Sequence, residues 1–183
     1  MSFVADNGTP LSVPSVGSSI TVNLAPQSST IIEAPNTGSL SEGYVLTALP
    51  GGVTGYGVVR QSVTGIGDQE AVVPLASAAS TRVNLSWDDT NYITAVAIVN
   101  PSPVATTVAL TITDATGKPL GTTALPLAAN SKTEATLRSL LPNPSVLAGQ
   151  RGYAVFSVTT GNVAVLGLRF NGSAFTSIPT TGN

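Results

Sequence analysis

Apolar and polar residues alternate with a period of two along much of this chain, as in strands that bury one face. The clearest example is the run Thr81–Trp87, in which Val83, Leu85 and Trp87 fall on one side. Similar runs recur at short, regular intervals and are separated by Gly, Pro, Asn or Asp, which favour turns. This spacing predicts an all-β protein built from sandwich-like sheets.

The alternation divides the chain into a series of short predicted strands. Those in the first part are Ile20–Leu24, Thr30–Glu33, Tyr44–Leu49, Val53–Arg60 and Glu70–Leu75. Those in the second part are Thr81–Trp87, Ile93–Val99, Val104–Thr113, Leu120–Leu127, Thr133–Leu137, Gly152–Thr159, Val163–Phe170 and Phe175–Ile178. The leucines of Leu137–Pro142 are spaced by three and four and predict a short helical turn, which Pro142 prevents from extending. The region Ala34–Leu40 lacks such leucines and is predicted to be a loop.

An internal repeat divides the chain into two copies. Gly43-Tyr44 leads to Val59-Arg60 over the same number of residues that separates Gly152-Tyr153 from Leu168-Arg169. The upstream and downstream matches are Asp6–Leu11 with Asp114–Leu120, and Val73-Pro74 with Ile178-Pro179. A repeat of this length is typical of tandem domains. It predicts two β-sandwich modules, one covering residues 1–75 and the other residues 76–183.

The first copy begins part-way through the repeated pattern. Before Asp114 the second copy has the predicted strands Ile93–Val99 and Val104–Thr113, whereas the first has only Met1–Ala5 before Asp6. We therefore expect the first module to lack its initial strands and to expose an unpaired apolar edge. Another chain, preceding residues of a longer parent protein or the second module would fill that edge by strand addition or packing. The connecting segment Leu75–Ser80 is short, so the two modules are expected to touch.

Several motifs resemble those of a known group of proteins. They are Gly55–Arg60, Asp68–Leu75, Trp87–Asn91, Ala97–Ser102 and Leu168–Gly172. Together they are similar to an uncharacterised family of immunoglobulin-like β modules found near the C-termini of large secreted or surface bacterial proteins. The resemblance implies two tandem immunoglobulin-like sandwiches and assigns no catalytic activity. It also implies that one or two further strands would precede Asp6, which would make Met1 an internal residue of a longer parent.

Composition excludes some functional classes. Hydrophobic residues make up 42% of the chain and charged residues 9%, and the net charge is −2. The few basic residues form no run that could bind a phosphate backbone, so nucleic-acid binding is not expected. No apolar stretch is long enough for a membrane span, and no signal peptide is visible. The bias towards Thr, Ser, Gly and Val is typical of an extracellular bacterial β module.

Residues for catalysis or metal binding are few. Cysteine and histidine are absent, which removes disulfides, thiolate metal sites and any Ser-His-Asp arrangement. The nine carboxylates are Asp6, Glu33, Glu42, Asp68, Glu70, Asp88, Asp89, Asp114 and Glu134. A glycosidase needs two of them across a cleft, and the choice of Asp68 with Glu70 or Asp88 with Asp89 would be arbitrary. We interpret the carboxylates as turn and strand-end residues and assign no catalytic, cofactor-binding or metal-ligating residue.

Other polar and aromatic residues have structural interpretations. The segment Asp88–Asn91 could offer oxygen ligands to calcium, but its residues are those that a turn uses. Trp87 is in phase with Val83 and Leu85, which predicts a place in the core. The repeat-equivalent residues are Tyr44 with Tyr153, for which we expect a packing role, and Arg60 with Arg169, which we expect to hold a carboxylate or loop carbonyls.

The resulting hypothesis is a non-enzymatic extracellular structural or adhesive β module that assembles through strand addition. The alternative is a carbohydrate-binding module of a larger secreted protein, and an enzyme is a third class without visible machinery. The expected partners are further copies of the chain or strands of a parent protein at the first module, with a glycan in the alternative. Nucleic acid, membrane insertion and cofactors are not expected.

Overall fold

The computed structural model describes residues 1–35, 37, 39–75 and 79–182. The chain is all-β, as predicted, and its sheets are antiparallel. Helical structure in the described residues is confined to two 3-10 turns, η1 (Leu137–Leu140) and η2 (Pro144–Leu147). The predicted connection Leu75–Ser80 and loop Ala34–Leu40 lie partly outside the described residues. We call residues 1–75 the N-terminal part and residues 79–182 the C-terminal part.

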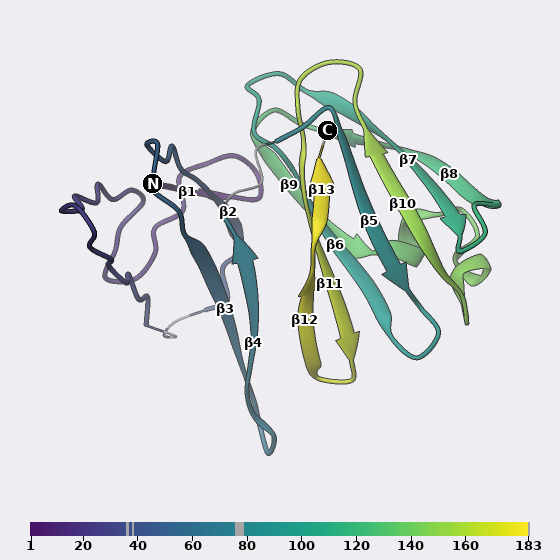
Figure 1. Ribbon diagram of the computed structural model, residues 1–183, viewed down its shortest axis with the longest axis horizontal. Helices are drawn as coiled ribbons and strands as arrows, with labels where there is room; N and C mark the ends of the chain where they lie inside the picture. The colour runs from purple at the N-terminus through teal and green to yellow at the C-terminus, as the bar shows by residue number, and fades with distance from the viewer. Residues whose placement is uncertain (36, 38, 76–78, 183) are drawn as a thin grey trace.

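The C-terminal part is a sandwich of two sheets (Figure 1). The five-stranded sheet has the order β13 (Thr180–Gly182), β5 (Arg82–Asp88), β10 (Arg151–Ser157), β7 (Thr106–Asp114) and β8 (Pro119–Leu127). The four-stranded sheet has the order β12 (Ala174–Ile178), β11 (Ala164–Asn171), β6 (Ile93–Asn100) and β9 (Ser131–Thr136). Consecutive strands β5 and β6 belong to different sheets, so the chain crosses the sandwich between them. The eight strands predicted here are confirmed within a few residues, and β13 was not predicted.

The core lies between these two sheets and consists of the residues that the alternation indicates. Val83, Leu85 and Trp87 have exposed fractions of 4%, 1% and 2%. Phe156 on β10 and Ile98 on β6 are fully buried and belong to the same cluster. Because side chains alternate across a strand, each of these strands sends every second residue into the core and the others outward. The predicted core position of Trp87 is confirmed.

One end of the sandwich is closed by the two short helical turns. Leu137 in η1 and Leu147 in η2 are both fully buried in the core cluster. The predicted short turn within Leu137–Pro142 is confirmed, and η2 begins at Pro144, whose fixed φ suits the first position of a helical turn. The two turns therefore cover the open end between the sheets.

The N-terminal part has much less regular structure. Its strands form two separate pairs, β1 (Ser2–Ala5) with β2 (Gly43–Leu46) and β3 (Tyr56–Val63) with β4 (Gly67–Pro74). The predictions of strands at Ile20–Leu24 and Thr30–Glu33 are wrong. Leu24 is 40% exposed and Ile31 is 91% exposed, and Ile20, Val22 and Ile32 are only half-buried, so no layer fully covers the apolar residues of these segments. Local alternation without a partner surface does not stabilise a strand.

The two strand pairs β1–β2 and β7–β10 have the same register. Adding one constant to the residue numbers of each pair in β1–β2 gives a pair in β7–β10. The matching pairs are Val4–Tyr44 with Thr113–Tyr153, and Ala5–Gly43 with Asp114–Gly152. The turns that follow also match, since Gly8 and Gly117 both have positive φ, at 87° and 88°. Ala5 is thus the counterpart of Asp114, and the sequence alignment of Asp6 with Asp114 is wrong by one residue.

Close backbone approach explains the glycines at the matched positions Gly43, which begins β2, and Gly152, the second residue of β10. A Cβ atom on Gly43 would lie 2.2 Å from the carbonyl oxygen of Val4. A Cβ atom on Gly152 would lie 2.0 Å from the carbonyl oxygen of Thr113. Because neither carbonyl belongs to a flexible side chain, no other residue fits at these two positions without moving the backbone.

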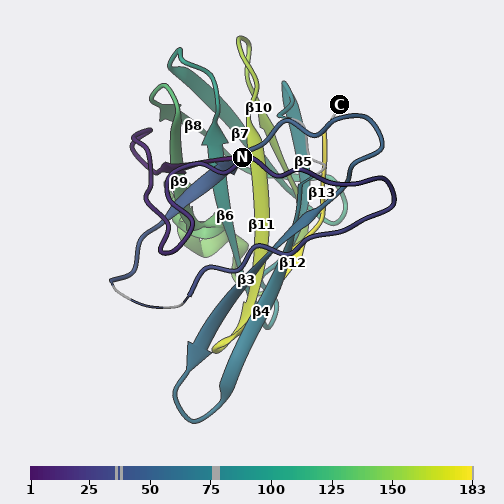
Figure 2. The same ribbon diagram turned by 90° about the vertical axis from the view of Figure 1, so that its left-hand side faces the viewer.

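The N-terminal part lies over the outer side of the four-stranded sheet. Strand β4 runs against the edge strand β12. At the opposite edge, on β9, the backbone N–H of Lys132 donates to the carbonyl of Asp6 at 2.9 Å. Figure 2 looks from this side and shows β3 and β4 crossing in front of the sheet. The contact expected between the two parts is therefore present.

The burial pattern makes a prediction about stability. Replacing the fully buried Phe156 by alanine should destabilise the C-terminal part by about 3–5 kcal/mol, because it removes apolar contacts and leaves a cavity. Val59→Ala, at a position 52% exposed, should change stability by less than about 0.5 kcal/mol. Urea unfolding followed by the fluorescence of the single tryptophan, Trp87, measures both. Equal midpoints for the two variants would contradict the assigned core.

Candidate functional site

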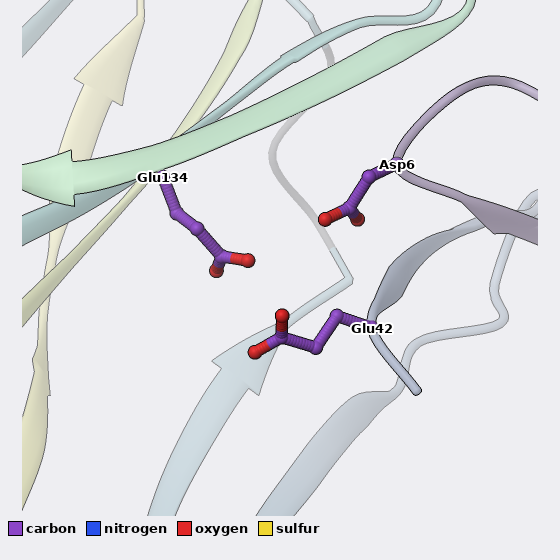
Figure 3. Close-up of side chains that lie close together, drawn as sticks. All are labelled: Asp6, Glu42 and Glu134. Carbon is purple, nitrogen blue, oxygen red and sulfur yellow. The ribbon is translucent and has the colours of Figure 1, made fainter. Parts of the chain in front are cut away.

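Three carboxylates from distant segments meet where the N-terminal part contacts β9 (Figure 3). Asp6 follows β1, Glu42 precedes β2, and Glu134 lies on β9. One oxygen of each lies within 4.8 Å of the others. Asp6 is half-buried, and the other two are exposed. Among the described residues, no other group of three or more acidic side chains comes this close together.

A lysine supplies positive charge to this cluster. The Lys132 ammonium lies 3.2 Å from Asp6 Oδ1 and 3.2 Å from Glu134 Oε1, and its side chain is only 7% exposed. Asp6 Oδ1 is shielded from solvent and receives no hydrogen bond of good geometry despite this short distance. A buried ammonium is stable only when it is paired, so these carboxylates compensate its desolvation. The arrangement is an ion-pair network that attaches the N-terminal part to β9.

The sequence did not indicate this cluster. All three residues were among the carboxylates considered, but none was paired with another. Asp6 and Glu134 lie in different copies of the repeat, and only the docking of β1 beside β9 brings them together. For retaining or inverting glycosidases, the paired carboxyls stand about 5–10 Å apart with room for sugar between them. Here the oxygens are closer, and the Lys132 ammonium lies beside two of them.

The acidic pairs that the sequence did suggest have other partners. Asp68 and Glu70 flank Arg60 on the β3–β4 hairpin, with Arg60 Nε 3.8 Å from Asp68 Oδ2 and 2.7 Å from Glu70 Oε1. All three side chains are about half exposed. The expectation that Arg60 holds a carboxylate is confirmed. Its counterpart Arg169 instead lies over the ring of Tyr92, 4.6 Å from the ring centre, as in a cation–π contact.

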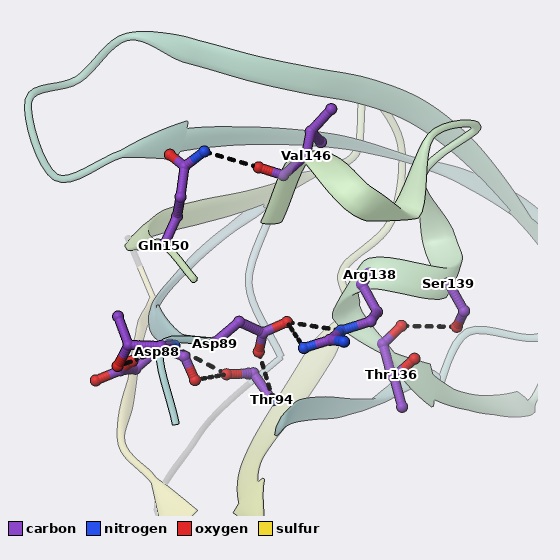
Figure 4. Close-up of polar contacts among 9 residues, drawn as sticks. Asp88, Asp89, Thr94, Thr136, Arg138, Ser139, Val146 and Gln150 are labelled. Carbon is purple, nitrogen blue, oxygen red and sulfur yellow. Dashed lines mark hydrogen bonds and ion pairs between the residues drawn. The ribbon is translucent and has the colours of Figure 1, made fainter. Parts of the chain in front are cut away.

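Asp89 is the fully buried carboxylate of the segment Asp88–Asn91. Its Oδ2 accepts hydrogen bonds from Arg138 Nε at 2.9 Å and lies 2.8 Å from Arg138 Nη2 (Figure 4). Its Oδ1 accepts from the backbone N–H of Thr94 at 2.9 Å. The side chain of Asp89 is 0% exposed, so both oxygens are satisfied by protein donors. This ion pair links the β5–β6 connection to η1 at the closed end of the sandwich.

Asp88 is held by its own turn. Its Oδ1 accepts from both the backbone N–H and the hydroxyl of Thr90, the geometry of an Asx turn. The hydrogen bond from the Thr90 hydroxyl is the main reason that the pKa of Asp88 is lowered, and the charges of Arg151 and Arg169 add to it. The turn interpretation of this segment is confirmed. Its two carboxylates are held by protein donors, that of Asp88 by Thr90 and that of Asp89 by Thr94 and Arg138.

An open depression of about 340 Å³ lies at the end of β5 and β10. Its lining includes Trp87, Asp88, Arg151, Tyr153 and Arg169. Tyr153 is 56% exposed, so the packing role expected for it is wrong, although its counterpart Tyr44 donates from its hydroxyl to the Asn130 carbonyl at 2.9 Å. Trp87 offers almost no accessible surface, since it is 2% exposed, and its indole N–H donates to the Thr113 carbonyl. The depression therefore presents one accessible aromatic ring beside two guanidinium groups.

Comparisons of the chain with protein-family models, with curated proteins and with solved structures find no match. Among the described residues, no helix has the length and hydrophobicity needed to span a bilayer. The functional argument therefore depends on the strands, edges and side chains of this chain.

The buried ion pair can be tested by removing its cation. Arg138→Met should destabilise the C-terminal part by roughly 3 kcal/mol, since it leaves the Asp89 carboxylate buried without a counter-charge. Arg60→Met, which breaks an exposed pair, should cost about 0–1 kcal/mol. Urea denaturation monitored at Trp87 compares the two. A smaller effect for Arg138→Met than for Arg60→Met would contradict the structural role of Asp89.

The titration of Asp88 provides a second test. Its lowered pKa means that the folded state gains stability above the pKa of the unfolded chain and loses it as the pH falls through the folded pKa. Thr90→Val removes the principal hydrogen bond, so the pKa of Asp88 should rise towards that of an ordinary aspartate. A carboxyl NMR titration of both proteins measures this directly. An unchanged pKa in the variant would show that the Thr90 hydroxyl is not the cause.

Proposed function

We propose that this chain is a non-enzymatic structural or adhesive β module of the cell exterior, which assembles with other chains by strand addition at its N-terminal part. The observation that carries the proposal is the exposure of apolar strand residues there. Tyr56, Val58 and Val72 are 69%, 49% and 46% exposed and lie on one face of the β3–β4 hairpin, which we call the open face. Isolated two-stranded hairpins are marginally stable in water, so such a face favours a partner.

The open face is directed away from the C-terminal part. On the opposite face of the hairpin, Ala71 is 3% exposed and pairs with Val59. Ala71 is also the only residue of the N-terminal part, as far as it is described, that belongs to the buried apolar set. The opposite face is covered in part, since Ala71, Val73 and Gln69 of β4 are buried or half-buried while Val59 of β3 is 52% exposed, whereas the open face is exposed along both strands. This geometry supports association with a further polypeptide.

A second candidate function, a carbohydrate-binding module, is favoured by the depression lined by Tyr153, Arg151 and Arg169. An exposed tyrosine ring can stack on a sugar, and guanidinium groups can bind the carboxylate of an acidic sugar. A glycan array with the purified chain, repeated with Tyr153→Ala, tests this function independently of assembly. Binding that survives Tyr153→Ala would place the glycan elsewhere.

The leading proposal predicts self-association that depends on the open face. Sedimentation velocity over a wide concentration range should show the chain forming dimers or larger species. Val58→Lys should weaken this association, because it places a charge on the apolar face. Val104→Lys is the matched control, since Val104 is 68% exposed and lies in the C-terminal part. A wild-type chain that remains monomeric at high concentration, or equal losses in the two variants, would contradict the proposal.

A further inference from the structure

The shared register of β1–β2 and β7–β10 allows the two parts to be compared strand by strand. At the same constant spacing, β2 corresponds to β10, and β3 corresponds to β11, with Arg60 matching Arg169. In the C-terminal part β10 has two neighbours, β7 and β5, and β11 has two neighbours, β12 and β6. In the N-terminal part β2 pairs with β1 alone and β3 with β4 alone, within the described residues. Of the neighbours of β10 and β11, the two without a counterpart beside β2 and β3 are therefore β5 and β6.

The strands β5 and β6 form one continuous segment, Arg82–Asn100. Strand β5 adds to β10 in the five-stranded sheet, and β6 adds to β11 in the four-stranded sheet. One segment thus completes both sheets and fills the space between them. We call this segment the β5–β6 arch. Within the described residues, β2 and β3 each have one unpaired edge. An arch of this kind would add to these two edges, as β5 adds to β10 and β6 adds to β11.

Residues of β2 and β3 are more exposed than their counterparts on β10 and β11, as expected if β2 and β3 lack a segment like the β5–β6 arch. Ala154 on β10 is fully buried, whereas its counterpart Val45 on β2 is 41% exposed. Val165 on β11 is 5% exposed, whereas its counterpart Tyr56 on β3 is 69% exposed. The residues at these positions are aliphatic or aromatic in both parts, and what differs most is how far they are covered. Each position faces the core in the C-terminal part.

A larger exposed residue at a matched position points to a partner of somewhat different shape. Gly167 on β11 is buried, and a Cβ atom there would lie 2.4 Å from Leu85 Cδ1. Its counterpart on β3 is Val58, which is 49% exposed. A residue as large as Leu85 would not fit opposite Val58 without adjustment. The partner therefore resembles the β5–β6 arch in its strand pattern and carries a smaller side chain at that position.

We propose that β2 and β3 form an acceptor site for a β-arch of another polypeptide, in the register that β5 and β6 have on β10 and β11. The partner is a pair of consecutive extended strands with apolar residues at alternate positions on its inner face. One strand would continue the β1–β2 sheet and cover the open face, as Leu85 of β5 covers Gly167 of β11, and the other would continue the β3–β4 sheet. Main-chain hydrogen bonds would satisfy both unpaired edges, as in other cases of strand addition. This inference rests on the proposed function and names the partner's chemistry and register.

The proposed register can be tested by disulfide trapping, because the natural chain contains no cysteine. In the C-terminal part Val155 pairs with Asn84, and Leu46 is the counterpart of Val155. The full chain carrying Leu46→Cys is mixed with a synthetic peptide of residues 82–100 that carries Asn84→Cys and also Leu85→Ala, so that a smaller side chain faces Val58. Directly opposite residues in neighbouring strands lie within disulfide range. We expect efficient formation of the mixed disulfide under mild oxidation.

Matched peptides distinguish a specific register from collision. A peptide with Leu85→Cys places the thiol on the other face of the strand, so its yield with Leu46→Cys should be several-fold lower. In the same mixture without cysteines, the peptide should slow hydrogen exchange in β2 and β3. A peptide with Val83→Thr and Leu85→Ser keeps a small residue opposite Val58 but lacks the apolar inner face. Weaker protection by this peptide than by the Leu85→Ala peptide would show that the apolar pattern is needed for binding, and equal protection would contradict it.

Equal cross-linking of the two cysteine peptides, or no added protection of β2 and β3, would overturn the acceptor site. If the chain nevertheless self-associates through the open face, the proposed assembly stands and only its arch-like register is wrong. If the chain is monomeric but traps the Asn84→Cys peptide, the acceptor site stands and self-association is wrong. If neither occurs, both proposals fail.

Discussion

The fold depends on one constraint, which is that alternating strand residues must be covered on their apolar side by a second sheet. In the C-terminal part this is achieved completely, since Leu85, Ile98, Leu110 and Phe156 interdigitate between two sheets and lie at or below 1% exposure. Each such side chain contributes about 1.5–3 kcal/mol when it is removed from water. The strand order, the crossing from β5 to β6 and the closure by η1 and η2 all serve this one layer of packing.

The same constraint explains the irregular structure of the N-terminal part, where no second sheet covers the apolar side of the strands completely. Strands persist where a neighbouring strand or the outer side of the four-stranded sheet supports them, as in β1–β2 and β3–β4. The segments Ile20–Leu24 and Thr30–Glu33 have apolar residues of the same kind, but these residues are at most half-buried, and the segments are irregular. Polar contacts then fix the position of this part, through the Tyr44 hydroxyl and the partly buried network around Lys132. Its attachment is therefore more polar than the core that it adjoins.

Local pattern predicted most of the C-terminal strands, the core position of Trp87 and the helical turn at Leu137, because each follows from residues near in sequence. It did not predict the meeting of Asp6, Glu42 and Glu134. These residues are far apart in the sequence, and they come together only because the N-terminal part packs against β9, a contact that local alternation cannot indicate. The exposure of Tyr153 was also missed, because equivalence with Tyr44 gives the position on the strand and not what covers the ring. The repeat alignment erred by one residue at Asp114, where Asp6 offered the same residue type but Ala5 has the same turn geometry. Identity of side chains is a weaker guide to register than the place of the turn glycine.

The close approach at Gly43 and Gly152 also limits how the two copies can diverge. Elsewhere in the repeat the side chains differ: Tyr56 corresponds to Val165, and Val58 to Gly167. The ion pair of Arg60 corresponds to the cation–π contact of Arg169. The strand pairing is nevertheless retained. At these two glycines any side chain would meet the carbonyl of the neighbouring strand before it met another side chain. A compensating substitution on the neighbouring strand cannot relieve that clash, because a carbonyl is common to all residues. The two copies are therefore free to evolve different surfaces and partners while remaining tied to glycine at the start of this strand.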